Sequence, residues 1–356
     1  SYTYLRLRTV PLCNPICSVN ITTSIRKLKN MLRETKRILV TGALGQIGSE
    51  LTLELRKIYG AENVIATDIV NKPTVEMSDS GPFAVMDVLS TTSIDNIVSK
   101  YKIDTIYHMA VILSAIGEKN PQMAWNVNMN GSINILEAGI KYEMCRIIIP
   151  SSIAVWGNGV PLENTPQACC LKPTTMYGVT KVCGELLADY YVQRFGLDVR
   201  GLRYPGIISH ATLPGGGTTD YAVAIYYEAI DKGKYTCFVN AETRLPMMYM
   251  PDAINSTIQL ANADFSNLKH HGDYNLSAMS FSVAELAESI KKYIPNFEIT
   301  YEPDYRQAIA DSWPNSIDDS SARKEWGWKH SWDLDAMTKD MLKNLRTRHE
   351  LGKLYK

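Results

Sequence analysis

The sequence lacks several features that would assign it to a particular class of protein. It has no apolar run of the roughly 18 residues that a membrane-spanning helix requires. It has no excess of positive charge, with 37 basic and 37 acidic residues, which argues against nucleic-acid binding. What remains is a 356-residue chain that is 45% hydrophobic, long enough for one large domain or two smaller ones.

Cysteines are few, and their spacing indicates no disulfide framework or zinc site. The seven thiols are Cys13, Cys17, Cys145, Cys169, Cys170, Cys183 and Cys237, with no CxxC pair among them. Scattered thiols are typical of proteins from a reducing compartment. Because no cluster of Cys, His and Glu ligands is evident either, we expect a metal-free protein.

Acidic residues are missing before Glu34, which sets residues 1–36 apart as an N-terminal extension. Its basic residues are Arg6, Arg8, Arg26, Lys27, Lys29 and Arg33. Basic, hydroxyl-rich segments without acids are typical of mitochondrial transit peptides. The composition therefore favours the mitochondrial matrix, and a cytoplasmic protein with an incidental extension is the alternative.

Strand-like and helix-like segments alternate from residue 37 onward. Strands are expected at 37–41, 63–68, 83–86, 104–108, 146–151 and 198–203. Helices are expected at 46–59, 91–101, 119–141 and 175–195. This alternation predicts an α/β fold, a doubly wound parallel Rossmann sheet with helices on both faces and ligands at the carboxyl ends of the strands.

The alternation breaks after residue 205, near Pro214 and the glycines that follow it. Further helices are expected at 218–232, 251–262 and 282–293, strands at 246–250, 273–276 and 297–301, and short helices to the end. We therefore expect a smaller, discontinuous C-terminal lobe that binds the substrate. The predicted dinucleotide-binding domain is 37–208 with 235–265 returning to it, and the predicted lobe is 209–234 and 266–356.

Residues 41–48, with the sequence TGALGQIG, are the most informative stretch of the chain. They lie between an apolar run and a helical pattern, and a helix start offers free N–H groups and partial positive charge to a pyrophosphate. Asp68 follows twenty residues after Gly48, where an acid would bind the adenosine ribose and favour NAD over NADP. The alternative is a structural strand–helix turn with a surface aspartate.

Tyr177 and Lys181 lie four residues apart on an expected helix, so their side chains share one face. A neighbouring ammonium favours the phenolate and lowers the pKa of a tyrosine below its usual value of about 10. The phenolate would take a proton from a substrate hydroxyl while hydride leaves the same carbon for a nicotinamide. Ser152, at a strand end, would hold the substrate oxygen, although a turn or helix cap is the alternative for such a serine.

Together these motifs resemble the extended short-chain dehydrogenase/reductase family. The resemblance is carried by Gly42-x-x-Gly45-x-x-Gly48, Asp87, His108-Met109-Ala110, Asn128-x-x-Gly131-Ser132-x-Asn134, 152–157 and Tyr177-x-x-x-Lys181. It implies Ser152, Tyr177 and Lys181 as the catalytic set. The expected cofactor-binding residues are Gly42, Gly45, Gln46, Ile47, Gly48, Asp68, Ile69, Met86, Asp87, Met109, Ala110, Val111, Tyr177, Lys181 and Ile207.

Later segments resemble one branch of that family, the short-chain type of L-threonine 3-dehydrogenase. They are 113–115, 202–209, 214–221, 247–252 and 309–314. The resemblance implies NAD-dependent oxidation of L-threonine to 2-amino-3-oxobutanoate. Two alternatives stay open: a nucleotide-sugar epimerase or dehydratase with tightly bound NAD, and a non-catalytic NAD-binding scaffold. Trp156 stands where the sugar-nucleotide branch usually has tyrosine, which weakens the first alternative.

A threonine pocket needs donors for a carboxylate and little spare volume. Ser114 follows the fourth expected strand, and Thr218 and Thr219 open an expected helix whose free N–H groups suit a carboxylate. Trp313 is expected to wall the pocket, and Ser152 and Tyr177 complete the expected substrate-binding set. Each of these residues has an ordinary alternative role as a helix cap, a loop residue or a core residue.

A diphosphate would need cations, and Arg203, Arg244 and Arg306 are the candidates in the second half of the chain. His108 stands alone at a strand end, so a structural role is expected for it. The helices 119–141 and 175–195 carry apolar residues beyond one core face. Because such helices pair across a dimer in the resembled family, the expected assembly is a homodimer through a four-helix bundle.

Overall fold

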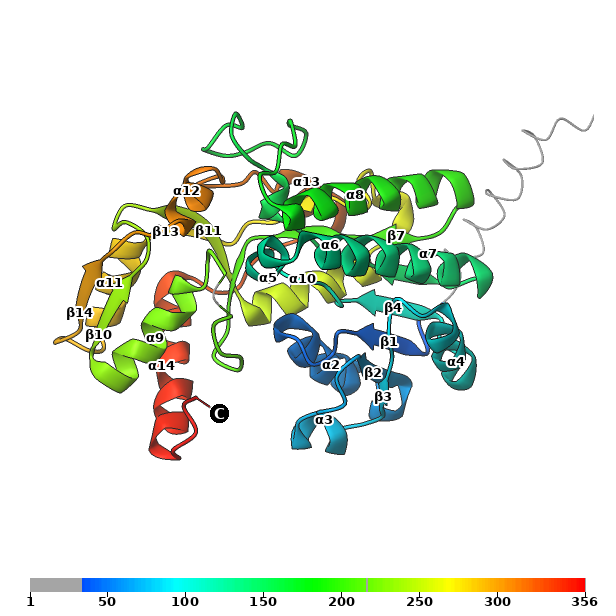
Figure 1. Ribbon diagram of the computed structural model, residues 1–356, viewed down its shortest axis with the longest axis horizontal. Helices are drawn as coiled ribbons and strands as arrows, with labels where there is room; N and C mark the ends of the chain where they lie inside the picture. The colour runs from blue at the N-terminus through cyan, green and yellow to red at the C-terminus, as the bar shows by residue number, and fades with distance from the viewer. Residues whose placement is uncertain (1–33, 216, 356) are drawn as a thin grey trace, which may run out of the picture.

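The computed structural model describes residues 34–215 and 217–355, so most of the expected N-terminal extension lies outside the described residues. A six-stranded parallel sheet with the order β3-β2-β1-β4-β5-β7 forms one half of the molecule (Figure 1). Its strands are β1 Ile38–Thr41, β2 Val64–Asp68, β3 Phe83–Val85, β4 Thr105–His108, β5 Arg146–Ile148 and β7 Val199–Arg200. The strand order reverses between β1 and β4, which confirms the doubly wound fold and creates a ligand crevice there.

Two of the expected strands are split, and their second parts form a separate ladder. The expected strand 146–151 breaks at Pro150, which has no N–H to donate, and 198–203 breaks at Gly201. The second parts pair in the parallel order β12-β8-β6, where β6 is Ser151–Ser152, β8 is Leu202–Tyr204 and β12 is Tyr274–Asn275. The end of β6 therefore carries Ser152 into the crevice beyond the central sheet.

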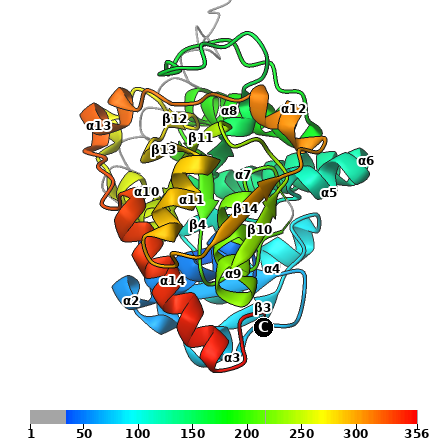
Figure 2. The same ribbon diagram turned by 90° about the vertical axis from the view of Figure 1, so that its left-hand side faces the viewer.

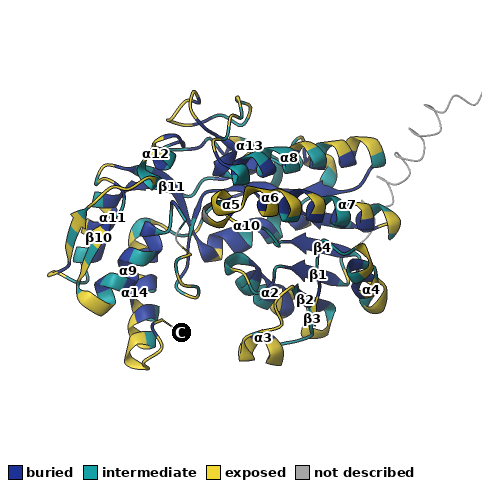
Figure 3. Ribbon diagram, viewed as in Figure 1, coloured by how far each residue is buried: buried dark blue, intermediate teal, exposed yellow. Residues whose placement is uncertain are grey.

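Alternate residues of the central strands face two separate cores. Ile38 and Val40 pack with α2 Gln46–Tyr59 and α10 Met250–Asn262. Leu39 instead faces the side of the sheet that is covered by α4 Thr91–Tyr101, α7 Gly131–Lys141 and α8 Met176–Phe195. Because both faces are covered, the central strands are buried throughout, as the dark blue arrows in Figure 3 show.

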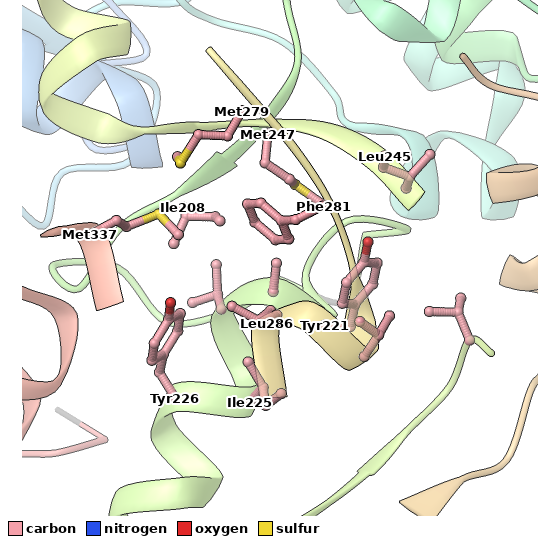
Figure 4. Packing of buried hydrophobic residues seen from close by; sticks show 14 of the residues in the cluster. Ile208, Tyr221, Ile225, Tyr226, Leu245, Met247, Met279, Phe281, Leu286 and Met337 are labelled. Carbon is pink, nitrogen blue, oxygen red and sulfur yellow. The ribbon is translucent and has the colours of Figure 1, made fainter. Parts of the chain in front are cut away.

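The second lobe has a core of its own (Figure 4). Its three-stranded sheet has the order β13-β11-β9, with β9 Gly206–Ile208, β11 Arg244–Tyr249 and β13 Met279–Ser282. Met247 and Phe281 of this sheet gather with Tyr226 and Leu286 from the helices that cover it. Those helices are α9 Tyr221–Lys232, α11 Val283–Lys291 and α14 Leu334–Glu350, and α14 runs diagonally beside the other two in Figure 2.

The remaining elements are short and lie around these two halves. They are α3 Val75–Asp79, α5 Ser114–Lys119, α6 Pro121–Trp125, α12 Arg306–Asp311, α13 Ser320–Trp326 and the paired strands β10 Lys234–Cys237 and β14 Glu298–Tyr301. The expectation of only short helices at the end was wrong, because α14 has 17 residues. The domain boundaries themselves stay a prediction.

The expected helix 119–141 is also interrupted, by a π-helical segment at Asn126–Asn130. Asn128 in this segment turns its amide inward, where it bonds both the N–H and the carbonyl of Ile112 and the hydroxyl of Thr180. Ser132 donates to the carbonyl of Asn128 at 2.6 Å. The regular i to i+4 hydrogen bonds of the helix are therefore interrupted where Asn128 holds the chain that follows β4. Such π-bulges are frequent at functional sites.

A buried ion pair ties the edge of the central sheet to the end of α10. The guanidinium of Arg200 is 1% exposed and donates two bonds to the carboxylate of Asp198, at 2.7 and 2.8 Å. It also donates to the carbonyls of Leu260 and Ala263, which belong to the last turn and C-cap of the helix. A lone arginine thus satisfies polar groups from two elements.

We predict that Arg200→Met lowers the free energy of unfolding by about 3–5 kcal/mol, because it leaves the buried carboxylate of Asp198 without its main partner. Chemical denaturation measures this change. Lys232→Met is the control, since the Lys232–Glu228 pair lies on the surface and should contribute little to stability. Equal effects of the two substitutions would contradict the structural role of Arg200.

Candidate active site

The turn between β1 and α2 requires glycine at two positions. Gly42 has a φ of +63°, and a Cβ on it would lie 2.6 Å from the backbone nitrogen of Ala110. A Cβ on Gly48 would lie 2.2 Å from the carbonyl oxygen of Gly42. The glycines therefore let the turn, the helix and the chain after β4 approach one another closely.

The N-terminus of α2 offers free N–H groups to the cavity that it lines. The first bond of the helix ladder is donated by Ser49 to the carbonyl of Gly45, so the N–H groups of Gln46 and Ile47 precede it. Within the described chain, no side chain caps this helix and its first turn contains no acid. Such a helix end is suited to bind the pyrophosphate of a dinucleotide, so the residues present fit NAD.

Five of the expected cofactor residues lie around this turn without lining the cavity: Asp68, Ile69, Met86, Asp87 and Ala110. The carboxylate of Asp68 accepts bonds from the N–H groups of Leu44 and Val70, both at 3.1 Å. Asp87 accepts from the N–H of Leu89 at 2.9 Å. Met86 is buried and Ile69 is 65% exposed. Their contact with a cofactor stays a prediction.

A cavity of about 440 Å³ lies between the glycine turn, the strand ends and the second lobe. The structure brings the other expected site residues together on its walls. They are Gly42, Gly45, Gln46, Ile47, Gly48, Met109, Val111, Ser114, Ser152, Tyr177, Lys181, Ile207, Thr218, Thr219 and Trp313. Residues that are 271 positions apart, Gly42 and Trp313, thus face one space.

The wall formed by the second lobe differs from the expected one. The helix expected to begin at residue 218 begins at Tyr221 instead, so Thr218 and Thr219 lie in the turn before α9. The N–H groups of Ala222 and Val223 already bond the carbonyls of Thr219 and Asp220. The expectation that free N–H groups of this helix receive a carboxylate was therefore wrong for Ala222 and Val223, because tight turns satisfy their N–H groups.

Asp220, at the N-cap of α9, is a cavity residue that the sequence analysis missed. Its carboxylate accepts a bond from the N–H of Gly217 at 2.9 Å, which closes the glycine loop. An acid in the first turn of the predicted helix was the available signal. The other unexpected wall residues are Leu44, His108, Leu113, Ile116, Pro150, Ser151, Ile153, Tyr204, Pro205, Gly206, Thr212, Leu213, Gly215 and Gly217.

Tyr177 and Lys181 lie one turn apart near the start of α8. Thr175 caps this helix by accepting a bond from the N–H of Gly178 at 3.0 Å. The ammonium of Lys181 lies 5.5 Å from the centre of the Tyr177 ring and donates to the carbonyl of Pro150 at 2.7 Å. Ser152, which forms a hydrogen bond with Tyr177, follows two residues after Pro150. One strand end therefore carries the partner of Lys181 and the partner of Tyr177.

The protonation of this pair differs from the sequence-based expectation. Burial raises the pKa of Tyr177 to about 12, although the hydrogen bond with Ser152 opposes the rise. Burial also lowers the pKa of Lys181 to about 8, and the carboxylate of Glu185 opposes that fall. The expected lowering of the tyrosine pKa by its lysine neighbour is therefore wrong for the protein alone, because removal from water disfavours both charged forms.

The side chains of His108 and of the three candidate arginines are bonded to other residues of the protein. Nδ1 of His108 lies 2.8 Å from the hydroxyl of Thr41, and burial lowers the pKa of His108 to about 3, so the ring is neutral. Arg203 forms a buried pair with Glu185, Arg244 bonds Glu285, and Arg306 bonds Asp304. Among the described residues, no three or more His, Cys, Asp or Glu side chains form a group suited to a metal ion.

Comparisons with known proteins agree with this geometry. The model of the NAD dependent epimerase/dehydratase family matches residues 38–277. An uncharacterized epimerase/dehydratase of Staphylococcus haemolyticus is 50% identical over 316 residues, which cover 88% of this chain and 99% of the relative. No helix in the described part of the chain is long and apolar enough to cross a membrane.

Two solved structures are similar to this chain over nearly their whole lengths. L-threonine dehydrogenase from Clostridium difficile is 53% identical, with a TM-score of 0.87 over 89% of this chain and 99% of that one. A monomeric L-threonine 3-dehydrogenase from a metagenome is 50% identical, with a TM-score of 0.84 over 87% and 99%. Both therefore share the fold described above.

Proposed function

This chain belongs to the NAD-dependent epimerase/dehydratase family, and we propose that it oxidises L-threonine with NAD to 2-amino-3-oxobutanoate. The observation that carries the proposal is that Ser152, Tyr177 and Lys181 line one cavity together with Trp313 and residues 217–220. The high identity to L-threonine dehydrogenases supports the choice of substrate. The resemblance found in the sequence implies the same activity.

We assign NAD to the glycine turn and the first turn of α2, where the N–H groups of Gln46 and Ile47 suit its phosphates. Bound there, NAD supplies the hydride acceptor and a positively charged ring that favours a nearby phenolate. Lys181 would hold the nicotinamide ribose, and Ile207, in the middle of β9, would border the ring. Asp68 would hold the adenosine ribose.

The protein's own part of the reaction is proton transfer and orientation. The hydroxyl of Ser152 holds the 3-hydroxyl of the substrate, and Tyr177 takes the proton from that oxygen. In the protein alone burial keeps the phenol protonated, with a pKa of about 12 although Ser152 opposes the rise, so the positive charge that bound NAD would bring is what makes the phenolate accessible. Trp313, which is 6% exposed, walls the cavity against water.

The charges on the cavity wall suit a small zwitterion better than a nucleotide sugar. Among the described wall residues, Asp220 is the one carboxylate and Lys181 the one ammonium. Asp220 is placed to bind the substrate ammonium, while Ser114, Thr218 and Thr219 offer hydroxyls to its carboxylate. The arginines that a diphosphate would need are engaged elsewhere, which disfavours the epimerase alternative.

We predict that Tyr177→Phe reduces the rate of NADH formation from L-threonine by at least about 100-fold while NAD affinity stays within about threefold, since the ring remains and the acid–base group is lost. Absorbance at 340 nm and calorimetric titration measure the two quantities. The wild-type rate should rise above neutral pH, because the base must lose its proton, until Lys181 loses its own proton at about pH 8.

The same assay separates the alternatives. Turnover of UDP-sugars without net NADH release would favour the epimerase, and no turnover of any 3-hydroxy amino acid or UDP-sugar would favour the scaffold. A flat pH profile with rate-limiting chemistry would contradict the phenolate base.

We predict that Asp68→Ala weakens NAD binding by about 10- to 100-fold and reduces discrimination against NADP, because a charge-assisted hydrogen bond to the ribose is lost. Asp68→Asn is the matched variant, since its amide oxygen can still accept from the N–H of Leu44. A cofactor preference that both variants share with the wild type would show that Asp68 only supports the glycine turn.

We further propose a homodimer through a four-helix bundle. Exposed apolar side chains lie on α8 and α6: Leu186 and Tyr190 are 64% and 53% exposed, and Met123 and Trp125 are 39% and 41% exposed. A pairing of these helices with a second copy would remove this surface from water. The monomeric relative makes the monomer the alternative.

We predict that the wild type sediments as two chains and that Leu186→Lys shifts it to one chain, because a lysine ammonium in the bundle would be buried without a partner. Leu351→Lys is the matched control, since Leu351 is equally exposed, at 63%, but lies beyond α14. A wild type that sediments as one chain at all concentrations would exclude the bundle.

For location we propose the mitochondrial matrix, on the composition of residues 1–33 alone. The staphylococcal relative makes the cytoplasm the alternative. Imaging of the full chain in cells distinguishes the two, and a diffuse cytoplasmic signal would exclude the matrix.

A further inference from the structure

A second, much smaller cavity lies beside Lys181, which is part of the wall of both cavities. Its volume is about 20 Å³, enough for one water molecule. Its polar wall includes Lys181, Glu185, Ser151, His108 and Asn128. The Nε2 atom of His108 is buried and has no hydrogen-bond partner among the described residues. The ammonium and the carboxylate of Glu185 therefore face one shared polar space inside the fold.

Glu185 lies one turn after Lys181 on α8, as Lys181 lies one turn after Tyr177, so the three side chains share one helix face. It is 5% exposed. One carboxylate oxygen accepts from the hydroxyl of Ser151 at 2.5 Å and from Nε of Arg203 at 2.8 Å, and the other accepts from the second nitrogen of the guanidinium at 2.8 Å. The carboxylate is thus fixed between the catalytic helix and the strand end.

Resting on the proposed function, we propose that Glu185 is a positioning residue for the dehydrogenation. Its carboxylate keeps the ammonium of Lys181 charged across the small cavity, and its bond to Ser151 fixes the strand end that carries Ser152. In the proposed reaction Lys181 would touch the cofactor and Ser152 would touch the substrate, whereas Glu185 would act through both of them.

The partners of Arg203 support this role for Glu185. Arg203 also donates to the side-chain oxygen of Asn275 at 2.9 Å and to the carbonyl of Gln167 at 3.2 Å, and it lies 3.8 Å from the carboxylate of Asp273. The guanidinium therefore has other acceptors. Lys181, by contrast, is the group whose charge depends on Glu185, because among the charges around it Glu185 is the one that raises its pKa.

Some of the charged and titratable groups that face Lys181 and Glu185 raise the pKa values of these two residues, and others lower them. From α8 they are Tyr177 and Asp189, from β4 His108, from β8 Arg203, from the segment before β12 His270 and Asp273, and from the 158–174 loop Cys169. Burial and Asp273 raise the pKa of Glu185, while Arg203 and Ser151 lower it. If the carboxylate is removed, the burial of Lys181 is unopposed, so the lysine loses its proton at a lower pH.

The test is the pH dependence of NAD binding, followed by quenching of tryptophan fluorescence. NAD affinity should fall as Lys181 deprotonates, with a midpoint near its pKa of about 8, and Lys181→Met should abolish this step. In Glu185→Gln the midpoint should move down by about one pH unit, and kcat with L-threonine at neutral pH should fall by about twofold from the lost lysine charge alone.

Two further variants keep the test decisive. Glu185→Gln with Arg203→Gln removes both members of the buried pair, so no lone charge remains to unfold the protein, and the midpoint should move by a similar amount. Asp198→Asn breaks a comparable buried arginine pair at the sheet edge, and it should lower stability without moving the midpoint.

An unmoved midpoint in both Glu185 variants, or a wild type without the step, would overturn the proposal. If the midpoint moves as expected but the wild type oxidises no L-threonine, the proposed substrate is wrong and the role of Glu185 stands. Restoration of the wild-type midpoint by Glu185→Asp would confirm that the negative charge, rather than the shape of the side chain, carries the effect.

Discussion

The site depends on keeping a charged ammonium inside a dry part of the fold. Burial lowers the pKa of Lys181 to about 8, and the carboxylate of Glu185 opposes this fall. The carbonyl of Pro150 accepts directly, at 2.7 Å, at the point where a proline breaks the strand. Ser152 follows on the same strand and Tyr177 precedes on the same helix, so the contacts that hold the lysine also set the distance between the other two groups.

The cavity belongs to both halves of the molecule, and one contact joins them close to it. The hydroxyl of Ser209, just after β9, donates to the carboxylate of Glu50 on α2 at 2.5 Å. Glu50 lies one turn after the helix start that suits the cofactor phosphates, and Ser209 lies three residues before Thr212 on the cavity wall. The Ser209–Glu50 hydrogen bond therefore joins the helix that would bind the cofactor to the chain that leads into the substrate loop.

The sequence predicted the parts of the site that depend on local geometry. The glycine turn is such a part, because a Cβ at Gly48 would overlap the carbonyl oxygen of Gly42 six residues earlier. The helix that carries Tyr177 and Lys181 is another, since four-residue spacing fixes a shared face. The central parallel sheet followed from the alternation of strands and helices, and the structure confirms it.

What the sequence could not predict depends on distant parts of the chain. The pKa of Tyr177 moves up because segments far apart in sequence bury it, and no local pattern encodes that burial. The π-helical break at Asn128 reflects a bond to Ile112, sixteen residues away. The start of α9 was misplaced because turn bonds among Gly217, Thr219 and Asp220 hold the chain before the helix, although the composition there is compatible with a helix.

Helix α8 shows why composition alone understates such a site. One face carries Tyr177, Lys181 and Glu185 toward the two cavities, and a second packs Ala188 and Val192 into the core beneath the sheet. A third exposes Leu186 and Tyr190. Because α8 buries polar side chains and exposes apolar ones, it does not divide into one polar face toward solvent and one apolar face toward the core. A second copy that covered the third face would pack against the exposed side of α8. The same helix would then form the dimer contact and position Tyr177, so dimer formation could affect where the base lies.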